Sequence, residues 1–492
     1  MIILFTKDSH NYVVTSTLPR EFGGRTKSLL ERTKNLSKKF GLKFTIVTTN
    51  YQPNYYKTYQ KYYEKNYVNE KVDFLNIYDY FSGRNYENRK PVEHPVEISG
   101  YDFCEIDKEQ TYRYFKNGYY ELYRSYDKKT GILKFEDIMD VYSRKRKERL
   151  EYNNFGICHK KIVYKRDTLN KLEEIFYDDN GEVYLIINYS GADNNKLVRV
   201  YLLQQNNMIM FKTEKDFFQY AFDQILQAGG VTFCDARLLD KPLLNSVVNT
   251  KKYFVLHNSH NIGGVFRESY RYIIENADKA TMIIVLTHEQ LNDLLELGVN
   301  PERLTVIPHS MDDDERDVGS HKPERKFIYL GRLVPEKQVP HIITAFKKVI
   351  EKYPEYSLEI YGDGEEVKKI SQLIGEMQIS VNVKMMGRTE DIPGVFRSGI
   401  ASIIASDYEG FGLVIMESLH YGCPVISYDF KYGPRDLIED SKNGYIIEKN
   451  NIDMLADTMI KMINNPITDA KLSSDYYLSS TIEKWGKLIN QR

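Results

Sequence analysis

The second half of the chain alternates short apolar segments with amphipathic segments of helical length. We predict strands at residues 327–330, 357–361, 381–386, 400–405 and 424–427, and helices at 341–352, 365–377 and 454–463 with a short one near 395. Successive strands that are separated by helices pair in parallel, so this half should form a doubly wound α/β sheet. Ligands bind such a sheet at the carboxyl ends of its strands, which makes the residues after each strand candidate binding residues.

The most informative of these stretches runs from Asp407 to Ser418, after the predicted strand 400–405. A Gly-Phe-Gly turn at 410–412 leads into an amphipathic helix, whose first backbone N–H groups would face any anion at that edge. Glu409 lies in the loop and Glu417 about two turns into the helix, so both can point at one ligand. Two carboxylates beside an anion site suit a ligand that carries both phosphates and sugar hydroxyls.

Cations and glycines follow other strands on the same predicted edge. Arg332 and Lys337 share one loop, where they offer a planar fork and a compact ammonium to a pyrophosphate, although alone they could be solvated loop cations. Each glycine after a strand could likewise be a plain turn. Together they would make room for a bulky ligand: Gly362, Gly364, Gly387, Gly410 and Gly412.

The first half starts as a βαβ unit. We expect a strand at Ile2–Thr6, a polar loop, the pair Gly23 and Gly24, a helix over 29–40 and a strand over 42–48. Paired glycines let backbone N–H groups approach a phosphate, but such a turn can also serve only to pack a helix on a strand. The predicted domains are a Rossmann-like domain at 1–50 and 216–310, a second one at 326–472, and a C-terminal helix at 473–492.

Residues 51–215 have a different texture. Short alternating segments rich in tyrosine are separated by Asn-Gly and Gly turns, which is the pattern of an antiparallel meander. We predict a β-rich insertion in the first domain that binds a polymeric acceptor or forms an oligomer interface; the sequence does not separate these roles. The basic run Arg144–Arg149, with Arg25 and Lys27, could bind an anionic polymer, or the run could be a solvated helix face.

Charge and cysteine content narrow the class of protein. The net charge is −1, so no global field attracts nucleic acid. The four cysteines form no CxxC pair, which is typical of a reduced, cytoplasmic chain. No apolar run approaches the ~18 residues of a membrane span, which leaves peripheral association at the inner face of the membrane. We expect no metal site at Asp312–Glu315, a solvated charge run, or at His257 and His260, which have no apparent third ligand.

Together these motifs resemble the nucleotide-sugar half of the retaining glycosyltransferases of family 4. The resemblance rests on Gly331-Arg332-Leu333 with Lys337, Tyr361-Gly362-Asp363-Gly364, Gly387, and the Glu409–Glu417 spacing that marks the group. Segment 428–440 with Asn443-Gly444-Tyr445 is similar to wall teichoic acid α-glycosyltransferases and to serine-directed GlcNAc transferases of Gram-positive adhesins. The resemblance implies two Rossmann-like domains facing a cleft (GT-B type), with a β-rich insertion in the N-terminal domain.

The resemblance also implies roles for individual residues. The donor would be UDP-GlcNAc or UDP-glucose, with Arg332 and Lys337 stabilising the leaving diphosphate, Glu409 and His257 facing the donor sugar, and Glu417 holding the ribose. The other implied donor-binding residues are Gly23, Gly24, Tyr361, Gly362, Gly387, Arg388, Gly410, Phe411, Gly412 and Leu413. Cations and helix dipoles can do this work, so we expect no metal or other cofactor.

The acceptor is less determined. The leading expectation is the polyol-phosphate chain of wall teichoic acid. The alternatives are the serines of a serine-rich or Ser-Asp-repeat adhesin, and a non-catalytic, glycopeptide-binding partner subunit of the same fold. The full set of Arg332, Lys337, Glu409 and Glu417 argues against the partner subunit, which has no need of them. We also expect a homo-oligomer.

Overall fold

The computed structural model describes residues 11–490 except 85, 87, 88, 107, 108, 167, 193, 205, 206 and 314–322. The predicted strand Ile2–Thr6 and part of the Asp312–Glu315 run lie outside these residues. The described chain divides into two compact units. Unit 1 contains residues 27–40 and 252–490, and unit 2 contains residues 11–26 and 41–251.

The later part of unit 1 is a six-stranded parallel sheet in the order β22-β21-β20-β23-β24-β25. Its strands are β20 (Lys326–Leu330), β21 (Ser357–Tyr361), β22 (Val383–Gly387), β23 (Ala401–Ile404), β24 (Val425–Tyr428) and β25 (Gly444–Ile447). The chain begins in the middle at β20, runs outward to β22, and then returns to β23 on the other side of β20. The carboxyl ends of β20 and β23 therefore form the topological switch point of the sheet, where ligands bind.

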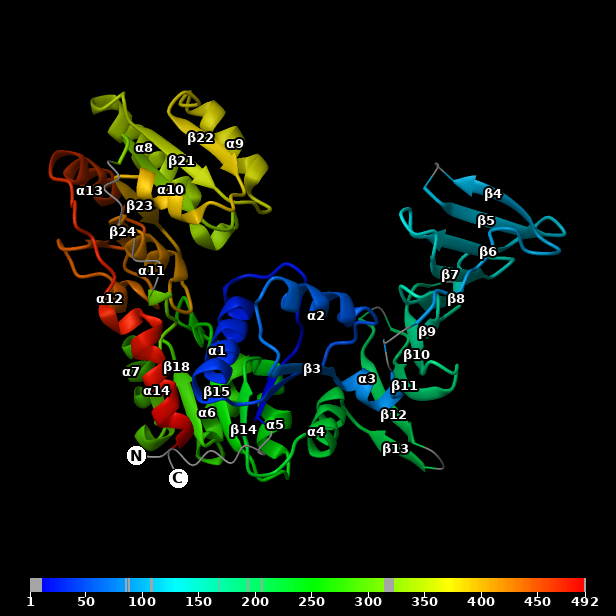
Figure 1. The fold of residues 1–492 in the computed structure, drawn as a ribbon. Coiled ribbons are helices and arrows are strands. Elements are labelled where there is room, and N and C mark those ends of the chain that lie inside the picture. The colour runs from blue at the N-terminus through cyan, green and yellow to red at the C-terminus, as the bar shows by residue number, and fades with distance from the viewer. Residues whose placement is uncertain are drawn as a thin grey trace. The chain divides into compact units, whose positions relative to one another are not determined.

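Helices cover this sheet as predicted (Figure 1). They are α8 (Val339–Lys352), α9 (Val367–Glu376), α10 (Ile392–Ser398), α11 (Leu413–His420), α12 (Pro434–Leu437) and α13 (Ile452–Asn464). Helix α8 buries Ile342, Phe346 and Val349 on one stripe and packs against α13. The doubly wound prediction for this half is confirmed. Strand β25 was not among the predicted strands.

The earlier part of unit 1 holds the parallel strands β15 (Lys251–Val255), β18 (Met282–Val285) and β19 (Leu304–Val306). Its main helices are α1 (Gly24–Phe40), α6 (Glu268–Glu275), α7 (His288–Glu296) and α14 (Leu478–Asn490). Helix α14 follows α13 in the chain but packs against α1, where the Arg32 guanidinium lies 5.3 Å from the Trp485 ring centroid. The Tyr253 hydroxyl also donates to the Leu488 carbonyl at 3.1 Å. The last helix therefore ties the end of the chain to its earlier elements.

Unit 2 contains a second run of parallel strands, in the order β14-β1-β2-β3. They are β1 (Asn11–Thr15), β2 (Phe44–Thr48), β3 (Val72–Asn76) and β14 (Val231–Cys234), with helices α2 (Tyr55–Glu64), α3 (Ile77–Ser82), α4 (Glu214–Ile225) and α5 (Asp240–Asn245). The expectation of a polar loop before Gly23 was wrong over β1, whose residues are all buried. This strand is short, but parallel neighbours on both sides bury it completely.

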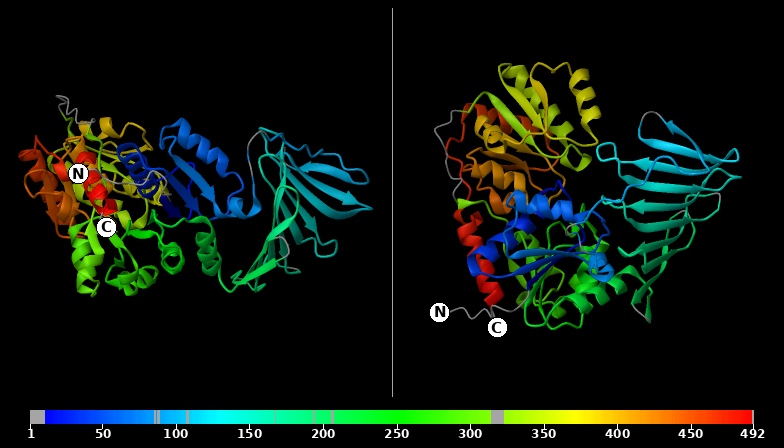
Figure 2. Two further views of the ribbon diagram at one scale, coloured as in Figure 1. Left: turned by 60° about the horizontal axis from the view of Figure 1, so that its bottom comes forward. Right: turned by 45° about the vertical axis from the view of Figure 1, so that its right-hand side comes forward.

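The rest of unit 2 is a ten-stranded antiparallel sheet whose strands follow one another in chain order, as Figure 2 shows. They are β4 (Asp102–Ile106), β5 (Thr111–Lys116), β6 (Tyr119–Tyr126), β7 (Leu133–Met139), β8 (Arg146–Tyr152), β9 (Cys158–Tyr164), β10 (Lys171–Tyr177), β11 (Val183–Tyr189), β12 (Leu197–Gln204) and β13 (Asn207–Phe211). The predicted meander is present. However, the insertion begins later than residue 51, because β3 pairs in parallel with β2.

The basic run Arg144–Arg149 is not a helix face. Arg144 has a positive φ of 56° in the turn before β8, and the residues from Arg146 onward are strand. The guanidinium groups of Arg146 and Arg149 both pair with Asp137 on β7. These two arginines therefore share one carboxylate within the sheet, and the exposed cations of the run are Arg144, Lys145 and Lys147.

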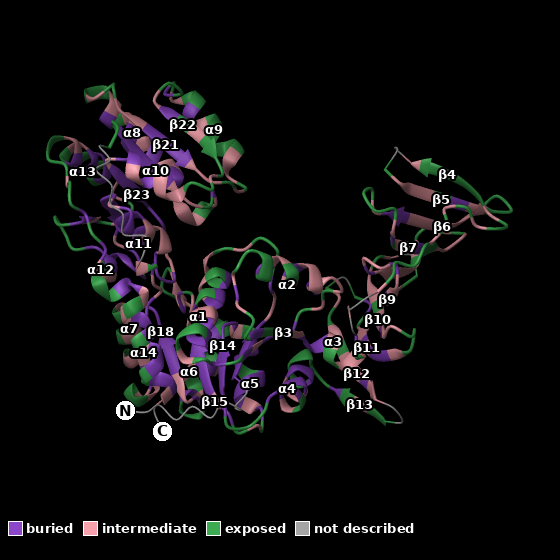
Figure 3. Ribbon diagram, in the orientation of Figure 1, coloured by how far each residue is buried: buried purple, intermediate pink, exposed green. Residues whose placement is uncertain are grey.

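The two kinds of sheet differ in burial (Figure 3). The parallel strands are largely buried, whereas most residues of the antiparallel strands are half-buried or exposed. This agrees with helices covering the parallel sheets. Within the described residues, no helix is both long enough and apolar enough to span a membrane.

Candidate active site

The structure places Arg332 and Lys337 directly after β20, at the switch point. Gly331 donates its N–H to the Tyr361 carbonyl at 3.0 Å, and the Tyr329 hydroxyl donates to the Arg332 carbonyl at 2.8 Å. These bonds hold the loop while the Arg332 side chain extends into solvent, 3.5 Å from Glu336. A fixed backbone with an extended guanidinium suits the capture of a phosphate.

Lys337 and Glu409 form an ion pair across the switch point. Lys337 ends a short turn of 3₁₀ helix, and Glu409 lies in the loop after β23. Ser406 donates its hydroxyl to Glu409 Oε1 at 3.0 Å, and Gln338 Nε2 donates to Asp407 Oδ2 at 2.8 Å. The predicted cation and sugar-side carboxylate are therefore brought together, and the two loops are joined by further hydrogen bonds.

Glu417 lies in the second turn of α11, and its side chain is 15% exposed. Burial raises the pKa of this carboxyl, while Lys27 opposes the rise. The Lys27 Nζ lies 3.7 Å from Glu417 Oε1. The sequence reading placed Lys27 only in a general basic patch, because nothing in a sequence shows which carboxylate a lysine on α1 will meet.

Glycines allow backbones to approach closely at this edge. A Cβ on Gly362 would lie 1.8 Å from the Gly331 carbonyl oxygen, and its φ of 144° also favours glycine. A Cβ on Gly410 would lie 2.0 Å from the His257 carbonyl oxygen. Of the glycines predicted to make room for a ligand, Gly362, Gly364 and Gly410 make room for neighbouring backbone, whereas Gly387 has nothing within 4 Å of its Cβ position and Gly412 meets the Ile415 side chain. Gly410 also sets its loop against the residue predicted to face the donor sugar.

The helix start predicted to bind an anion is formed by Phe411, Gly412 and Leu413. Gly412 caps α11 with φ 88°, and Leu413 is the first helical residue. Phe411 is buried, with its ring 5.1 Å from the ring of His309. Ser28 on α1 bonds to His309 Nδ1 at 2.6 Å, and the His257 ring stacks on His309 at 5.7 Å. His309 therefore connects His257 to Phe411, the residue that precedes Gly412 at the start of α11.

The remaining predicted donor residues take different positions. Tyr361 accepts a hydrogen bond through its backbone, but its hydroxyl donates to Glu359 at 2.8 Å. Gly387 ends β22 and accepts from the Gly362 N–H at 2.8 Å. Arg388 is exposed and pairs with Asp363 at 3.2 Å. Gly23 is the N-cap of α1 and Gly24 is its first residue. Both are assigned to unit 2, whereas α1 from Lys27 onward is assigned to unit 1. Their contribution to a phosphate site stays a prediction.

Sequence reasoning assigned no separate role to Gly433. Its φ is 125°, and a Cβ there would lie 1.9 Å from the Phe411 carbonyl oxygen. A hydrogen bond also joins the loop after β24 to the loop after β23, because the Tyr432 N–H donates to the Glu409 carbonyl at 3.0 Å. The Tyr-Gly-Pro sequence of this loop was a usable signal for such a close backbone approach.

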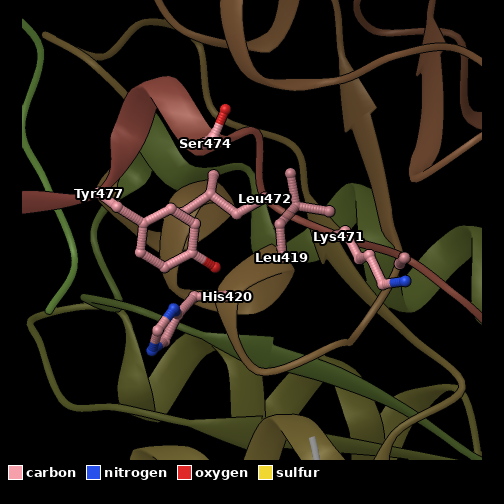
Figure 4. A pocket seen from close by; sticks show the side chains of 7 residues that line it. Leu419, His420, Lys471, Leu472, Ser474 and Tyr477 are labelled. Carbon is pink, nitrogen blue, oxygen red and sulfur yellow. The ribbon is translucent and has the colours of Figure 1, made fainter. Parts of the chain in front are cut away.

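A pocket of about 300 Å³ lies at the other end of α11 (Figure 4). It is lined by Leu419, His420, Ala470, Lys471, Leu472, Ser474 and Tyr477. The predicted donor residues are at the start of α11, so this pocket is separate from them. No group of three or more His, Cys, Asp or Glu side chains that could hold a metal occurs among the described residues.

Comparison with known proteins also indicates a glycosyltransferase. Residues 310–477 match the family described as "Glycosyl transferases group 1". A poly(glycerol-phosphate) alpha-glucosyltransferase of Bacillus subtilis is 26% identical over 98% of this chain and 75% of its own length. A poly(ribitol-phosphate) alpha-N-acetylglucosaminyltransferase of Staphylococcus aureus is 27% identical over 86% of this chain and 88% of its own.

A solved structure extends the likeness to three dimensions. The crystal structure of S. aureus TarM in complex with fondaparinux, alpha-GlcNAc-glycerol and UDP superposes with a TM-score of 0.83. The two chains are 26% identical, and the match covers 98% of this chain and 100% of the other. The similarity therefore includes the β-rich insertion as well as both α/β regions.

Proposed function

We propose that this chain, whose residues 310–477 match the family described as glycosyl transferases group 1 and which has the GT-B fold, transfers GlcNAc or glucose from a UDP-sugar to a polyol-phosphate polymer. The observation that carries the proposal is the Lys337–Glu409 ion pair, with Glu417 on the helix that follows, at the switch point of a parallel sheet. The site offers a cation for a diphosphate and two carboxylates for hydroxyls, which is the chemistry of a nucleotide sugar.

The chemistry follows from where charge develops. As the bond from the sugar's anomeric carbon to the diphosphate breaks, negative charge grows on the departing oxygen, and Arg332 and Lys337 stabilise it together with the N–H groups at the start of α11. The acceptor hydroxyl attacks on the same face, and its proton passes to the departing phosphate oxygen. Configuration is thereby retained without a nucleophile from the protein. No step in this scheme needs a metal, so we propose that none is required.

The charge distribution of the antiparallel sheet supports an anionic acceptor. The β5–β6, β7–β8, β9–β10 and β11–β12 turns lie at one end of the strands and form what we call the basic hairpin edge. Its exposed cations are Arg144, Lys145, Lys165, Arg166 and Lys196 in the turns, with Lys116 at the end of β5 and Lys147 at the second position of β8. Asp140 accepts hydrogen bonds from within its own turn, and the sequence also has Asp167 between β9 and β10 and Asp193 between β11 and β12. Glu109, Asp127 and Glu182 lie in turns at the opposite end.

The shape of the basic hairpin edge favours a chain over a flat surface. Neighbouring strands are about 4.8 Å apart, so successive turns lie roughly 10 Å from one another. Twist of about 20–25° per strand rotates the row by more than about 100° from its first turn to its last. A planar anionic membrane could meet only part of such a row, whereas a flexible chain of phosphodiesters can follow it. The relatives' names specify poly(glycerol-phosphate) and poly(ribitol-phosphate), which are chains of this kind.

Two further parts of the proposal concern setting and assembly. The four cysteines, Cys104, Cys158, Cys234 and Cys423, are free thiols, which suits a reducing cytoplasm where UDP-sugars are made. We place the reaction there, at the inner face of the membrane, where a growing polymer is available. The protein is also proposed to be a homo-oligomer, with the antiparallel sheet as the element that associates.

The deciding experiment offers two donors and two acceptor classes to the purified chain. UDP-GlcNAc and UDP-glucose are each incubated with poly(ribitol-phosphate), poly(glycerol-phosphate) and a Ser-Asp-repeat protein, and sugar incorporation is read by mass. We expect incorporation into a polyol-phosphate that persists in EDTA and is lost in Lys337→Ala. Incorporation only into the protein would replace this acceptor by serine. No incorporation and no UDP release would favour a non-catalytic partner subunit.

A further inference from the structure

Lys27 lies between two carboxylates on different helices. It is in the first turn of α1, and its Nζ is 3.7 Å from Glu417 Oε1 on α11 and 4.0 Å from Glu31 Oε1 one turn further along α1. Both distances are longer than a direct hydrogen bond, and the lysine side chain is about half exposed. Lys27 is therefore an electrostatic partner that can shift between the two carboxylates.

Glu417 requires a nearby cation to keep its carboxyl ionised. Its side chain is mostly buried, and burial raises the pKa of the carboxyl. A carboxylate can accept hydrogen bonds from both hydroxyls of a ribose, whereas the protonated acid becomes a donor at one oxygen. The proposed ribose contact therefore requires a charge that burial disfavours.

The other cations of the donor site are engaged with other carboxylates. Lys337 pairs with Glu409, Arg332 with Glu336, and Lys449 with Asp407. Among the described residues, the ion pair of Glu417 is the one with Lys27. The partner of the ribose carboxylate thus comes from α1, far from α11 in the chain.

Several titratable groups share this surrounding. Partial desolvation raises the pKa of Glu31, whose side chain is about half exposed; Lys27 opposes the rise, and Asp312 and Glu417 add to it. The groups around Lys27 are Glu31 and Lys34 on α1, Asp312 after β19, Glu417 on α11, and His309, which bonds to Ser28. Lys27 balances a cluster that is otherwise rich in carboxylates.

We propose that Lys27 is a positioning residue that keeps Glu417 ionised and turned toward the ribose, so that affinity for the nucleotide depends on α1. The proposal rests on the proposed function, because it presupposes a uridine nucleotide as donor. It goes beyond that function in assigning the electrostatic partner of the ribose carboxylate. Lys27 itself touches neither the sugar nor the reacting atoms in this scheme.

The first test needs no ligand. The carboxyl of Glu417 is titrated by carbon-13 NMR in the wild type, in Lys27→Met and in Lys38→Met, a control at an exposed lysine near the other end of α1. We expect Lys27→Met to raise the pKa of Glu417 and Lys38→Met to leave it unchanged. If the pKa of Glu417 in Lys27→Met equals that in the wild type, the proposal is overturned, whatever nucleotide the protein binds.

The second test measures binding by calorimetry, with UDP and with UDP whose ribose lacks the 2′ and 3′ hydroxyls. We expect Lys27→Met to weaken the binding of UDP about tenfold at pH 7, and Lys27→Arg to keep most of the wild-type affinity. In Lys27→Met, the pH below which UDP binding is lost should also be higher than in the wild type. Lys27→Met should have little effect on the dideoxy nucleotide or in a Glu417→Gln background. Equal losses for both nucleotides would mean that Lys27 contacts the diphosphate, and would overturn the positioning role.

The two tests separate the two proposals. A wild-type chain that binds no UDP would refute the proposed function, and the NMR titration would still decide whether Lys27 controls the charge of Glu417. A chain that binds UDP with the same affinity in Lys27→Met would refute the positioning role and leave the proposed function intact.

Discussion

Lys337 and Glu409 form an ion pair between the loops that follow β20 and β23, although the two residues are 72 positions apart in the chain. The pair exists because the chain leaves β20 on one side and returns on the other, which places the carboxyl ends of these strands side by side. Lys337 is mostly buried, so its charge is poorly screened by solvent. Such a cation is positioned to act on a departing diphosphate.

Replacing Lys337 by alanine should lower kcat by about 100- to 1000-fold, because the lost cation stabilises charge that appears only in the transition state. The KM for the donor should change much less, since Arg332 and the α11 N-terminus still bind the ground-state diphosphate. Steady-state kinetics with the UDP-sugar measures both values. A rise in KM at unchanged kcat would show that Lys337 only binds the donor.

Replacing Glu417 by alanine should mainly weaken donor binding, because the ribose would lose an ionised hydrogen-bond acceptor. The pH dependence follows from the raised pKa of this carboxyl. Binding needs the carboxylate, so donor affinity should be full above that pKa and fall as pH drops through it, at a higher pH than for an ordinary glutamate. Calorimetry measures the affinity for UDP between pH 5 and 8. The same dependence of this affinity on pH in the wild type and in Glu417→Gln would contradict the prediction.

Gly410→Ala should disrupt the site because of backbone contact, not charge. The added Cβ would lie 2.0 Å from the His257 carbonyl oxygen, so the loop carrying Glu409 must move or the protein lose stability by about 1–3 kcal/mol. Gly375→Ala is a matched control, since it lies in α9 with nothing within 4 Å of its Cβ and should be stabilising by about 0.4–1 kcal/mol. Thermal unfolding and activity of both variants would check this, and equal behaviour would contradict it.

The sequence was most informative where pattern and topology agree. The predicted strand 357–361 matches β21. Helices cover both faces of a parallel sheet, so its strands appear in the sequence as continuous apolar runs. The strands β1 and β3 were missed, because β1 lies in the segment assigned to a polar loop and β3 in the Tyr-rich segment assigned to the insertion. The proximity of Glu409 and Lys337 could be predicted, because both residues follow strands of one parallel sheet. The Lys27–Glu417 and His309–Phe411 contacts depend on how separate helices and loops pack, which no local pattern encodes.

Charge reversal at the basic hairpin edge should weaken acceptor use without affecting the donor. Lys147→Glu with Lys196→Glu changes an exposed residue near the start of β8 and an exposed residue of the β11–β12 turn. If the polymer follows this edge, its KM should rise about tenfold or more, and the loss should shrink at high salt because exposed charges are screened beyond about 10 Å at 0.1 M. The KM for the donor should not change, since none of these lysines belongs to the donor site.

The control for this variant uses the opposite end of the same strands. Lys128→Glu with Lys129→Glu makes the same change of net charge in the β6–β7 turn, where both lysines are exposed. Transfer to the polymer, measured against a short acceptor of one or two repeat units, should be unaffected by the control and selectively impaired by the Lys147 and Lys196 pair. Equal loss with both double variants would mean that net charge, and not a line of hairpin turns, attracts the acceptor. Equal loss on the short and long acceptors would instead show that the effect does not depend on a chain long enough to follow several hairpin turns.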